Sequence, residues 1–264
     1  MPEASIPGPA PLPRPVPVLA LGLAPLSLAQ AAEQVLAWAQ AGESRTLCAA
    51  NVHMVMEAHD DPAFQAVVNG ADLVVPDGVP LAWAMRLLGQ GRQERVYGPA
   101  LMLETCRLAS LRGASVGLYG STPEVLDKLQ VRLRERFPAL AIPFVCSPPF
   151  RPQTPEEEAA LLEAFRASGA VILFVGLGCP KQERWMDGQR PRLPAVMLGV
   201  GAAFDFHAGT LPQAPAWLQR AGLEWLFRLA QEPRRLWKRY LKHNPRFVAL
   251  LLLQLIRRRE RTWK

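Results

Sequence analysis

Short apolar segments alternate with longer amphipathic ones through most of the chain. The short segments are rich in Val, Leu, Ile and Ala and have the length of buried strands: 45–50, 71–75, 115–119, 141–145, 170–175 and 195–200. Segments with helical spacing of apolar residues precede or separate them: 26–42, 53–69, 79–89, 99–112, 123–136, 155–168 and 180–187. Apolar strands that alternate with helices form parallel sheets covered on both faces. The pattern therefore predicts an α/β fold with a mostly parallel sheet.

The N-terminal end departs from this alternation. Residues 1–17 contain seven prolines, so an irregular or disordered arm is predicted over 1–16. The segment 16–32 is similar to a secretory signal peptide, but Pro25 interrupts it and the helical pattern of 26–42 follows smoothly. We therefore expect this segment to be retained as the start of an α/β domain spanning 17–214.

The C-terminal end is a helical appendage, 215–264, in which no strand is evident. Helices are predicted over 215–231, 233–243 and 245–260. Residues 225–264 hold twelve Lys/Arg and two acids, a net charge of +10, whereas the whole chain carries +7. Such a basic segment indicates contact with phosphates, nucleic acid or an anionic membrane, or else a solvated helix face.

The appendage also contains an apolar stretch, 247–256, that is too short to cross a bilayer. It can lie in a membrane interface, or be buried against the domain or a second copy of the chain. No apolar run elsewhere has the length of a transmembrane helix. The four cysteines are scattered without a CxxC pair, which favours a reducing, cytosolic setting over a disulfide framework.

Several candidate site residues follow the predicted strands. Open parallel sheets bind ligands beyond the carboxyl ends of their strands. Four of these residues closely follow predicted strands: Asn51, Asp77, Gly78 and Gly120. The segment "GLGCPKQERW" adds Gly176, Gly178, Lys181, Gln182 and Glu183, and the segment "GVGAAFDFHAG" adds Asp205. Their convergence predicts a ligand cleft. The alternatives are a helix cap for Asp77 and, for the Asp205 segment, a turn that packs the appendage onto the sheet.

Arginines and histidines complete the candidate chemistry. Arg228, Arg235 and Arg239 can share a helical face, and guanidinium groups suit diphosphates. The four histidines show no ligand spacing such as HExxH, so no metal site is expected, and no cofactor is predicted.

The chain resembles the WecG/TagA/CpsF glycosyltransferases, glycosyltransferase family 26. The matching segments include "VVPDGVPLAW", "RVYG", "GLYGSTPEVLDKL", "VGLGCPKQERW", "GVGAAFDFHAG" and "LEWLFRLAQEPRRLWKRY", in the family's order, over roughly residues 17–242. The resemblance implies a Rossmann-like domain and a peripheral position at the cytoplasmic face of the cell membrane. It implies inverting transfer of a hexose or N-acetylhexosamine from a UDP-sugar to a polyprenyl-diphosphate-linked sugar, without an obligatory metal, in cell-surface polysaccharide or teichoic acid assembly.

The resemblance also implies residue roles. Asp77 matches the general base, Asn51 a residue that positions substrate, and Arg95 an arginine near the acceptor. Gln182 matches a residue of the nucleotide-sugar pocket. The arginines matched to the closing appendage are Arg228, Arg235 and Arg239.

The sequence departs from the family where Ala49 replaces a threonine two positions before Asn51. One alternative is therefore a catalytically degenerate scaffold that binds a membrane or a UDP-sugar. Another is an epimerase or dehydrogenase, which the absence of GxGxxG after the first strand disfavours. Nucleic acid is not expected, because the basic residues alternate with long aliphatic runs. The apolar appendage is compatible with a homo-oligomer.

Overall fold

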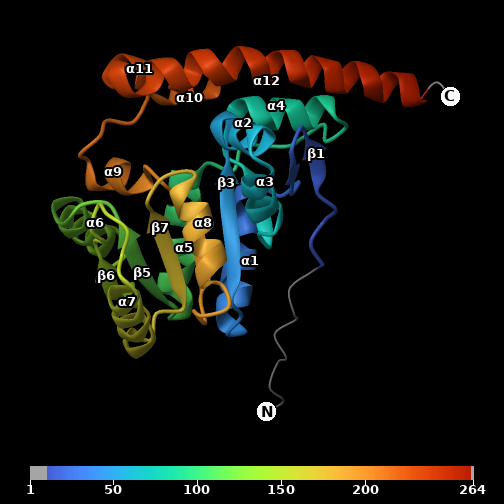
Figure 1. The fold of residues 1–264 in the computed structure, drawn as a ribbon. Helices are drawn as coiled ribbons and strands as arrows, with labels where there is room; N and C mark the ends of the chain where they lie inside the picture. The colour runs from blue at the N-terminus through green and yellow to red at the C-terminus, as the bar shows by residue number, and fades with distance from the viewer. Residues whose placement is uncertain (1–10, 263–264) are drawn as a thin grey trace.

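The computed structural model describes residues 11–262, with side chains described to residue 258. Its core is a six-stranded, all-parallel sheet in the order β4-β3-β8-β7-β5-β6 (Figure 1). The strands are β3 (Arg45–Ala50), β4 (Leu73–Pro76), β5 (Ser115–Gly120), β6 (Ala141–Cys146), β7 (Ile172–Gly176) and β8 (Val196–Gly199). The predicted α/β fold is confirmed, and each strand lies within two residues of its expected position.

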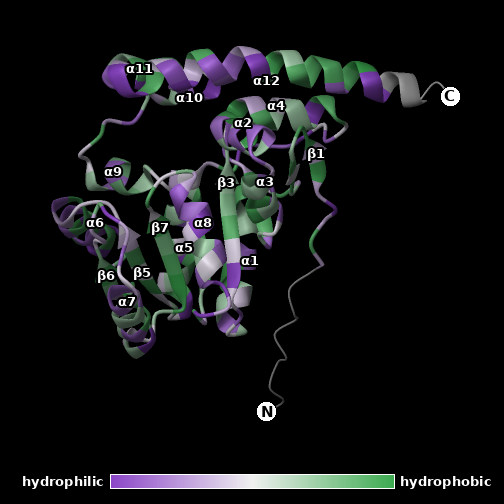
Figure 2. Cartoon of the chain, viewed as in Figure 1, coloured by the Kyte–Doolittle hydropathy of each residue, from purple (hydrophilic) through white to green (hydrophobic). Residues whose placement is uncertain are grey.

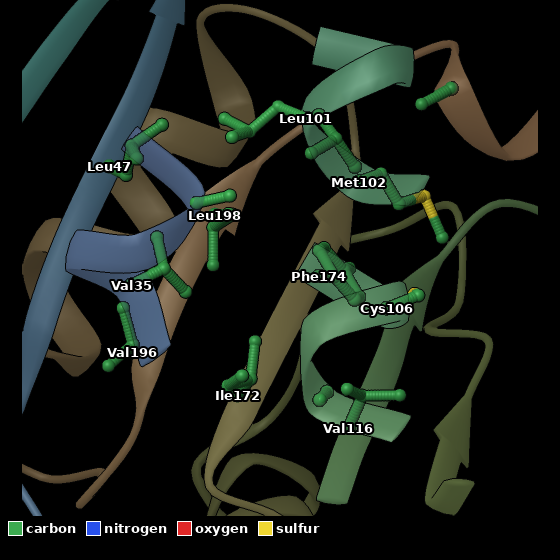
Figure 3. Packing of buried hydrophobic residues seen from close by; sticks show 14 of the residues in the cluster. Val35, Leu47, Leu101, Met102, Cys106, Val116, Ile172, Phe174, Val196 and Leu198 are labelled. Carbon is green, nitrogen blue, oxygen red and sulfur yellow. The ribbon is translucent and has the colours of Figure 1, made fainter. Parts of the chain in front are cut away.

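Helices cover both faces of the sheet. One face packs against α1 (Leu28–Gln40), α5 (Gly98–Arg112), α6 (Pro123–Arg136) and the short α9 (Ala203–Ala208). The other face packs against α2 (Val52–Asp60), α3 (Pro62–Asn69), α4 (Val79–Leu87), α7 (Pro155–Ser168) and α8 (Lys181–Gln189). Figure 3 shows the first core, where Val35, Leu101 and Phe174 lie among buried strand residues. Strands apolar on both sides are required for this three-layer arrangement.

The predicted helix 53–69 is wrong in one respect, because it is two helices. Asp61 ends α2 and caps α3, its Oδ1 accepting from the backbone N–H groups of Ala63 and Phe64. Pro62 takes the first position of α3, where its missing N–H costs nothing. An Asp-Pro pair therefore starts a new helix within an otherwise continuous helical pattern.

The N-terminal segment also differs from expectation. Residues 1–10 of the predicted arm lie outside the described residues, but Val16–Val18 and Leu21–Leu23 form an antiparallel hairpin, β1 and β2. Its apolar side chains are buried in the second core. The hairpin is attached by side chains of α3, since Asn69 Oδ1 accepts from the N–H of Gly22 and Gln65 donates to the Ala20 carbonyl.

The appendage lies over the carboxyl end of the sheet (Figure 1). It consists of α10 (Ala216–Arg220), α11 (Glu224–Gln231) and α12 (Pro233–Thr262), so the predicted helix 215–231 is divided in two. The predicted break at Pro245 is wrong, because α12 is continuous through it. Pro245 has no N–H to donate to the carbonyl of Leu241, four residues earlier in the helix. Both residues are exposed, so water can satisfy that carbonyl.

The surface of α12 alternates between polar and apolar stretches along its length (Figure 2). Over residues 11–262, none of the helices combines the length and the apolarity that crossing a membrane requires. All four cysteines are free.

Candidate active site at the carboxyl end of the sheet

A cavity of about 430 Å³ lies between the ends of β3 and β4 and the appendage. Apolar side chains from α4 and α12, including Trp83, Phe247 and Leu251, form part of its wall. The predicted site residues that line it are Asn51, Asp77, Gly78, Arg95, Arg228 and Arg239. The fold thus brings strand-end residues and appendage arginines to one place.

Asp77 follows β4 directly and is held by backbone groups. Its own N–H donates to the carbonyl of Ala50 at 2.8 Å, and its Oδ1 accepts from the N–H of Gly98 at 2.9 Å. Gly98 is the first residue of α5, so the carboxylate lies at the positive end of that helix. The N-cap of α4 is Gly78, without a side-chain hydrogen bond. The alternative in which Asp77 caps helix 79–89 is therefore wrong.

The environment of Asp77 suits a proton acceptor. Burial raises the pKa of its carboxyl, while Arg95 and the Gly98 hydrogen bond act in the opposite direction. Arg95 Nη2 lies 3.8 Å from Oδ1. Oδ2 takes part in no hydrogen bond with the described residues, so it is free for a ligand. A carboxylate of raised basicity beside a cavity is an arrangement for general base catalysis.

Arg95 connects Asp77 to the appendage. Its Nε donates to the carbonyl of Asp77, and its Nη2 lies 2.7 Å from Glu224 Oε2 at the start of α11. The Tyr97 hydroxyl donates to the other Glu224 oxygen at 3.0 Å, and the Arg95 guanidinium stacks on the Tyr97 ring at 3.7 Å. Glu224 therefore connects the appendage to the residues around Asp77.

The three predicted appendage arginines separate into two groups. Arg228 and Arg239 line the cavity, and the Nε of each is buried without a hydrogen-bond partner in the described part of the chain. Burial lowers the pKa of Arg239. Arg235 is largely exposed and pairs with Glu232 at 2.7 Å outside the cavity. Two half-buried guanidinium groups, each with an unpartnered Nε, are suited to an anionic ligand such as a diphosphate.

Asn51 lines the cavity but already has a structural role. It caps α2, its Oδ1 accepting from the N–H of Met54 at 3.2 Å. Ala49 lies nearby on β3, buried and beside Gly98. The position of the absent threonine hydroxyl therefore adjoins the backbone that holds Asp77.

The "GLGCPKQERW" segment lies outside the cavity lining. Gln182 and Glu183 are buried and bonded to each other at 2.7 Å, and Gln182 Oε1 accepts from the N–H of Gly178 at 3.1 Å. Burial raises the pKa of Glu183. Lys181 is exposed. These contacts organise the loop after β7, and they do not present the segment to the cavity.

Gly120, Gly176 and Asp205 are also outside the lining. A Cβ on Gly120 would lie 2.6 Å from the Gly176 backbone, and one on Gly176 would lie 2.7 Å from the Phe204 ring. Both glycines therefore allow β5, β7 and α9 to pack closely. Asp205 is half-buried in α9, where its Oδ1 accepts from the Thr210 hydroxyl at 3.3 Å.

Comparison with known proteins identifies the chain. Residues 16–261 match the family described as "Glycosyl transferase WecG/TagA/CpsF family". The protein belongs to this family. A relative from Bacillus spizizenii, named N-acetylglucosaminyldiphosphoundecaprenol N-acetyl-beta-D-mannosaminyltransferase, is 30% identical over 204 residues, which cover 77% of each chain. The predicted resemblance and the prediction of a glycosyltransferase are confirmed.

Sequence reasoning missed several residues that line the cavity of this glycosyltransferase: Trp83, Glu224, Trp225, Tyr240, His53 and His243. Glu224 and Trp225 stand in the quoted family segment and could have been found there. His243 approaches His53 and Glu57 of α2. Because 186 positions separate His243 from Glu57, no local spacing could have revealed this cluster.

Proposed function

We propose that this glycosyltransferase transfers a hexose or N-acetylhexosamine from a UDP-sugar to a polyprenyl-diphosphate-linked sugar, with inversion. The observation that carries the proposal is that one cavity holds a largely buried carboxylate, Asp77, and two arginines, Arg228 and Arg239, whose Nε atoms have no partner in the described part of the chain. This arrangement offers a proton acceptor and a diphosphate site together.

The reaction would proceed by a single displacement. Asp77 Oδ2 takes the proton of an acceptor hydroxyl while that oxygen forms a bond to the anomeric carbon of the donor. The bond between that carbon and the UDP oxygen breaks, and UDP leaves on the opposite side. One displacement inverts the anomeric configuration, and the proton remains on Asp77 until solvent removes it.

Arg228 and Arg239 would stabilise the negative charge that develops on the leaving diphosphate. Each has a buried Nε ready to donate. Guanidinium groups in this position make a divalent cation unnecessary for the transfer step, so we propose that transfer proceeds without an obligatory metal.

The relative's name suggests the first donor and acceptor to test, UDP-N-acetylmannosamine and a prenyl-diphosphate-linked N-acetylglucosamine. UDP release and product formation would be measured for a panel of UDP-sugars, with and without this acceptor, in the presence of a chelator. Acceptor-dependent product with one donor supports the proposal. UDP binding without transfer from any donor would favour the degenerate scaffold.

We further propose that the appendage contacts the anionic inner face of the cell membrane. Large apolar side chains on α12 recur at helical spacing and are about half exposed or more: Trp237, Leu241, Val248, Leu252 and Ile256. Trp83 and Leu87 of α4 are exposed and line the cavity, and exposed basic residues such as Lys238 and Arg257 occur on α12. Apolar contact together with cationic side chains is what interfacial binding requires.

Vesicle flotation tests the membrane proposal with a matched pair. Leu241 is 68% exposed on α12, and Leu111 is 71% exposed on α5. Leu241→Ser should reduce flotation with anionic vesicles, whereas Leu111→Ser should not. Equal flotation of both variants would contradict the proposal. If the apolar stripe instead forms a homo-oligomer, Leu241→Ser would reduce the molecular mass in solution and leave flotation unchanged.

A further inference from the structure

Two histidines and a glutamate converge where α12 crosses α2. His53 and Glu57 are one turn apart on α2, and His243 reaches them from α12. Glu57 Oε1 lies 3.8 Å from His53 Nδ1 and 3.3 Å from His243 Nε2. One ligand atom from each residue lies within 4.8 Å of the other two. The three groups thus surround a common point.

Protein contacts leave this cluster incompletely satisfied. Nδ1 of His53, which faces Glu57, is buried without a hydrogen-bond partner in the described part of the chain. Buried polar atoms nearly always have a partner. The unpartnered Nδ1 of His53 is also the atom nearest Glu57, so an ion placed between them would supply the missing interaction.

The charges around the cluster are compatible with metal binding. His53 and His243 contribute imidazole rings, and Glu57 contributes a carboxylate that offsets part of the charge of a bound cation. Neutral imidazole is the form that ligates metals. Arg239 and Lys242 of α12 add positive charge nearby, while Asp60 of α2 lies 3.4 Å from Lys242 and 2.6 Å from Arg246.

We propose that His53, Glu57 and His243 form a Zn²⁺ site that fastens α12 to α2. Two imidazoles and one carboxylate, with water in the fourth position, are a typical donor set for zinc. Bonds of about 2.0–2.1 Å place tetrahedral ligand atoms roughly 3.4 Å apart. The Glu57–His243 separation is close to this value, and a shift of the His53 ring closes the site. Glu57 is 31% exposed, which gives the ion a path from solvent.

The ion would act on the position of the appendage and not on group transfer. His53 and His243 belong to the wall of the cavity, so a zinc bridge between α2 and α12 holds the appendage half of that wall in place. Asp77 and the arginines keep their proposed roles with or without zinc. Metal binding and transferase activity can therefore be tested separately.

The test uses untagged, metal-stripped full-length protein without nucleotide. Zn²⁺ is titrated by calorimetry and by competition with a chromophoric chelator, and Co²⁺ serves as a spectroscopic probe. We expect one equivalent of Zn²⁺ and slower hydrogen exchange in α2 and α12 when it is bound. His53→Gln and His243→Gln should each weaken binding at least about a hundredfold, since even outer-shell changes cost 10–100-fold. His59→Gln, at an exposed position of α2, is the matched control.

A cysteine variant keeps the test decisive if a glutamine variant folds poorly. His243→Cys retains a zinc-binding side chain, and its Co²⁺ complex should gain the near-ultraviolet absorption of a thiolate ligand. The proposal is overturned if wild type binds no stoichiometric Zn²⁺, if both glutamine variants bind it as wild type does, or if His243→Cys binds Co²⁺ without the thiolate band.

Discussion

Replacing Glu224 by glutamine should loosen the appendage and shift the pH dependence of transfer. Glu224 lies 2.7 Å from Arg95, and the two side chains are only 13% and 17% exposed. A hydrogen bond to a charged group contributes about 1.5–3 kcal/mol. Glutamine keeps one oxygen for Tyr97 or Arg95, so we expect a loss of about 1–2 kcal/mol, or about 5–30-fold in the docking equilibrium of α10 and α11.

The direction of the pH shift follows from the charges around Asp77. A general base must be deprotonated, so activity rises with pH through the pKa of Asp77. The negative charge of Glu224 raises that pKa, and Arg95 lowers it. Removing the Glu224 charge leaves the positive charges of Arg95 and Arg228, both of which lower the pKa of Asp77, without this opposing charge. The acid limb of the profile should therefore move to lower pH, while kcat falls because the base is weaker and the arginines are less well placed.

The assay combines a pH profile of kcat/KM with hydrogen exchange over residues 216–231. Glu232→Gln is the matched control, because it removes the same charge from a pair with the largely exposed Arg235. We expect Glu224→Gln, but not Glu232→Gln, to show faster hydrogen exchange and an acid limb displaced to lower pH. An unchanged limb, or one displaced to higher pH, would refute the electrostatic reasoning; unchanged exchange would refute the connection through Glu224.

Three further predictions follow from individual contacts. Arg239→Met should weaken UDP binding about 10–100-fold by calorimetry without loss of thermal stability, because the buried Nε of Arg239 has no partner in the described part of the chain; lower stability with unchanged affinity would contradict this. Gly176→Ala should cost about 1–3 kcal/mol in chemical denaturation, since its Cβ would lie 2.7 Å from Phe204; an unaltered midpoint would contradict the packing argument. Arg246→Ala should cost about 0.5–1 kcal/mol at neutral pH, because its guanidinium holds the pKa of Asp60 well below the usual range. That loss should begin to shrink below about pH 4, where Asp60 takes up a proton in the unfolded chain, and should disappear only at the lower pH where the folded chain is protonated as well; a difference that stays constant as the pH falls through this range would contradict the assignment.

The sheet could be predicted because each strand is a short, mainly apolar segment between helical patterns. Asn51 and Asp77 could be predicted to meet for the same reason, since polar residues directly after parallel strands share one edge of the sheet. The hairpin over residues 16–23 could not, because its strands are only three residues long and the first contains a proline. Its burial depends on α3 and α12, including Gln254, which bonds to Pro17 and Leu19.

Which polar residues line the cavity could not be predicted from polarity alone, and a role of Gln182 and Glu183 in ligand binding stays a prediction. Gln182 and Glu183 were predicted to contact a ligand, yet they lie buried and bonded to each other. Arg228 and Arg235 both belong to the family segment, but only the first faces the cavity. The packing of the appendage decides which side of its helices faces the cavity. This packing depends on contacts between residues far apart in the sequence, such as Glu224 with Arg95.

The exchange of Asp77 for asparagine tests the central claim most directly. Asparagine retains an oxygen for the N–H of Gly98, so the cavity should persist while the base is lost. Transfer and UDP affinity would be measured beside Asp127→Asn, an exposed aspartate of α6. We predict that Asp77→Asn lowers kcat by about 10²–10⁴-fold and leaves UDP affinity within a few-fold of wild type. Transfer by Asp77→Asn at the rate of wild type and of Asp127→Asn would contradict the account.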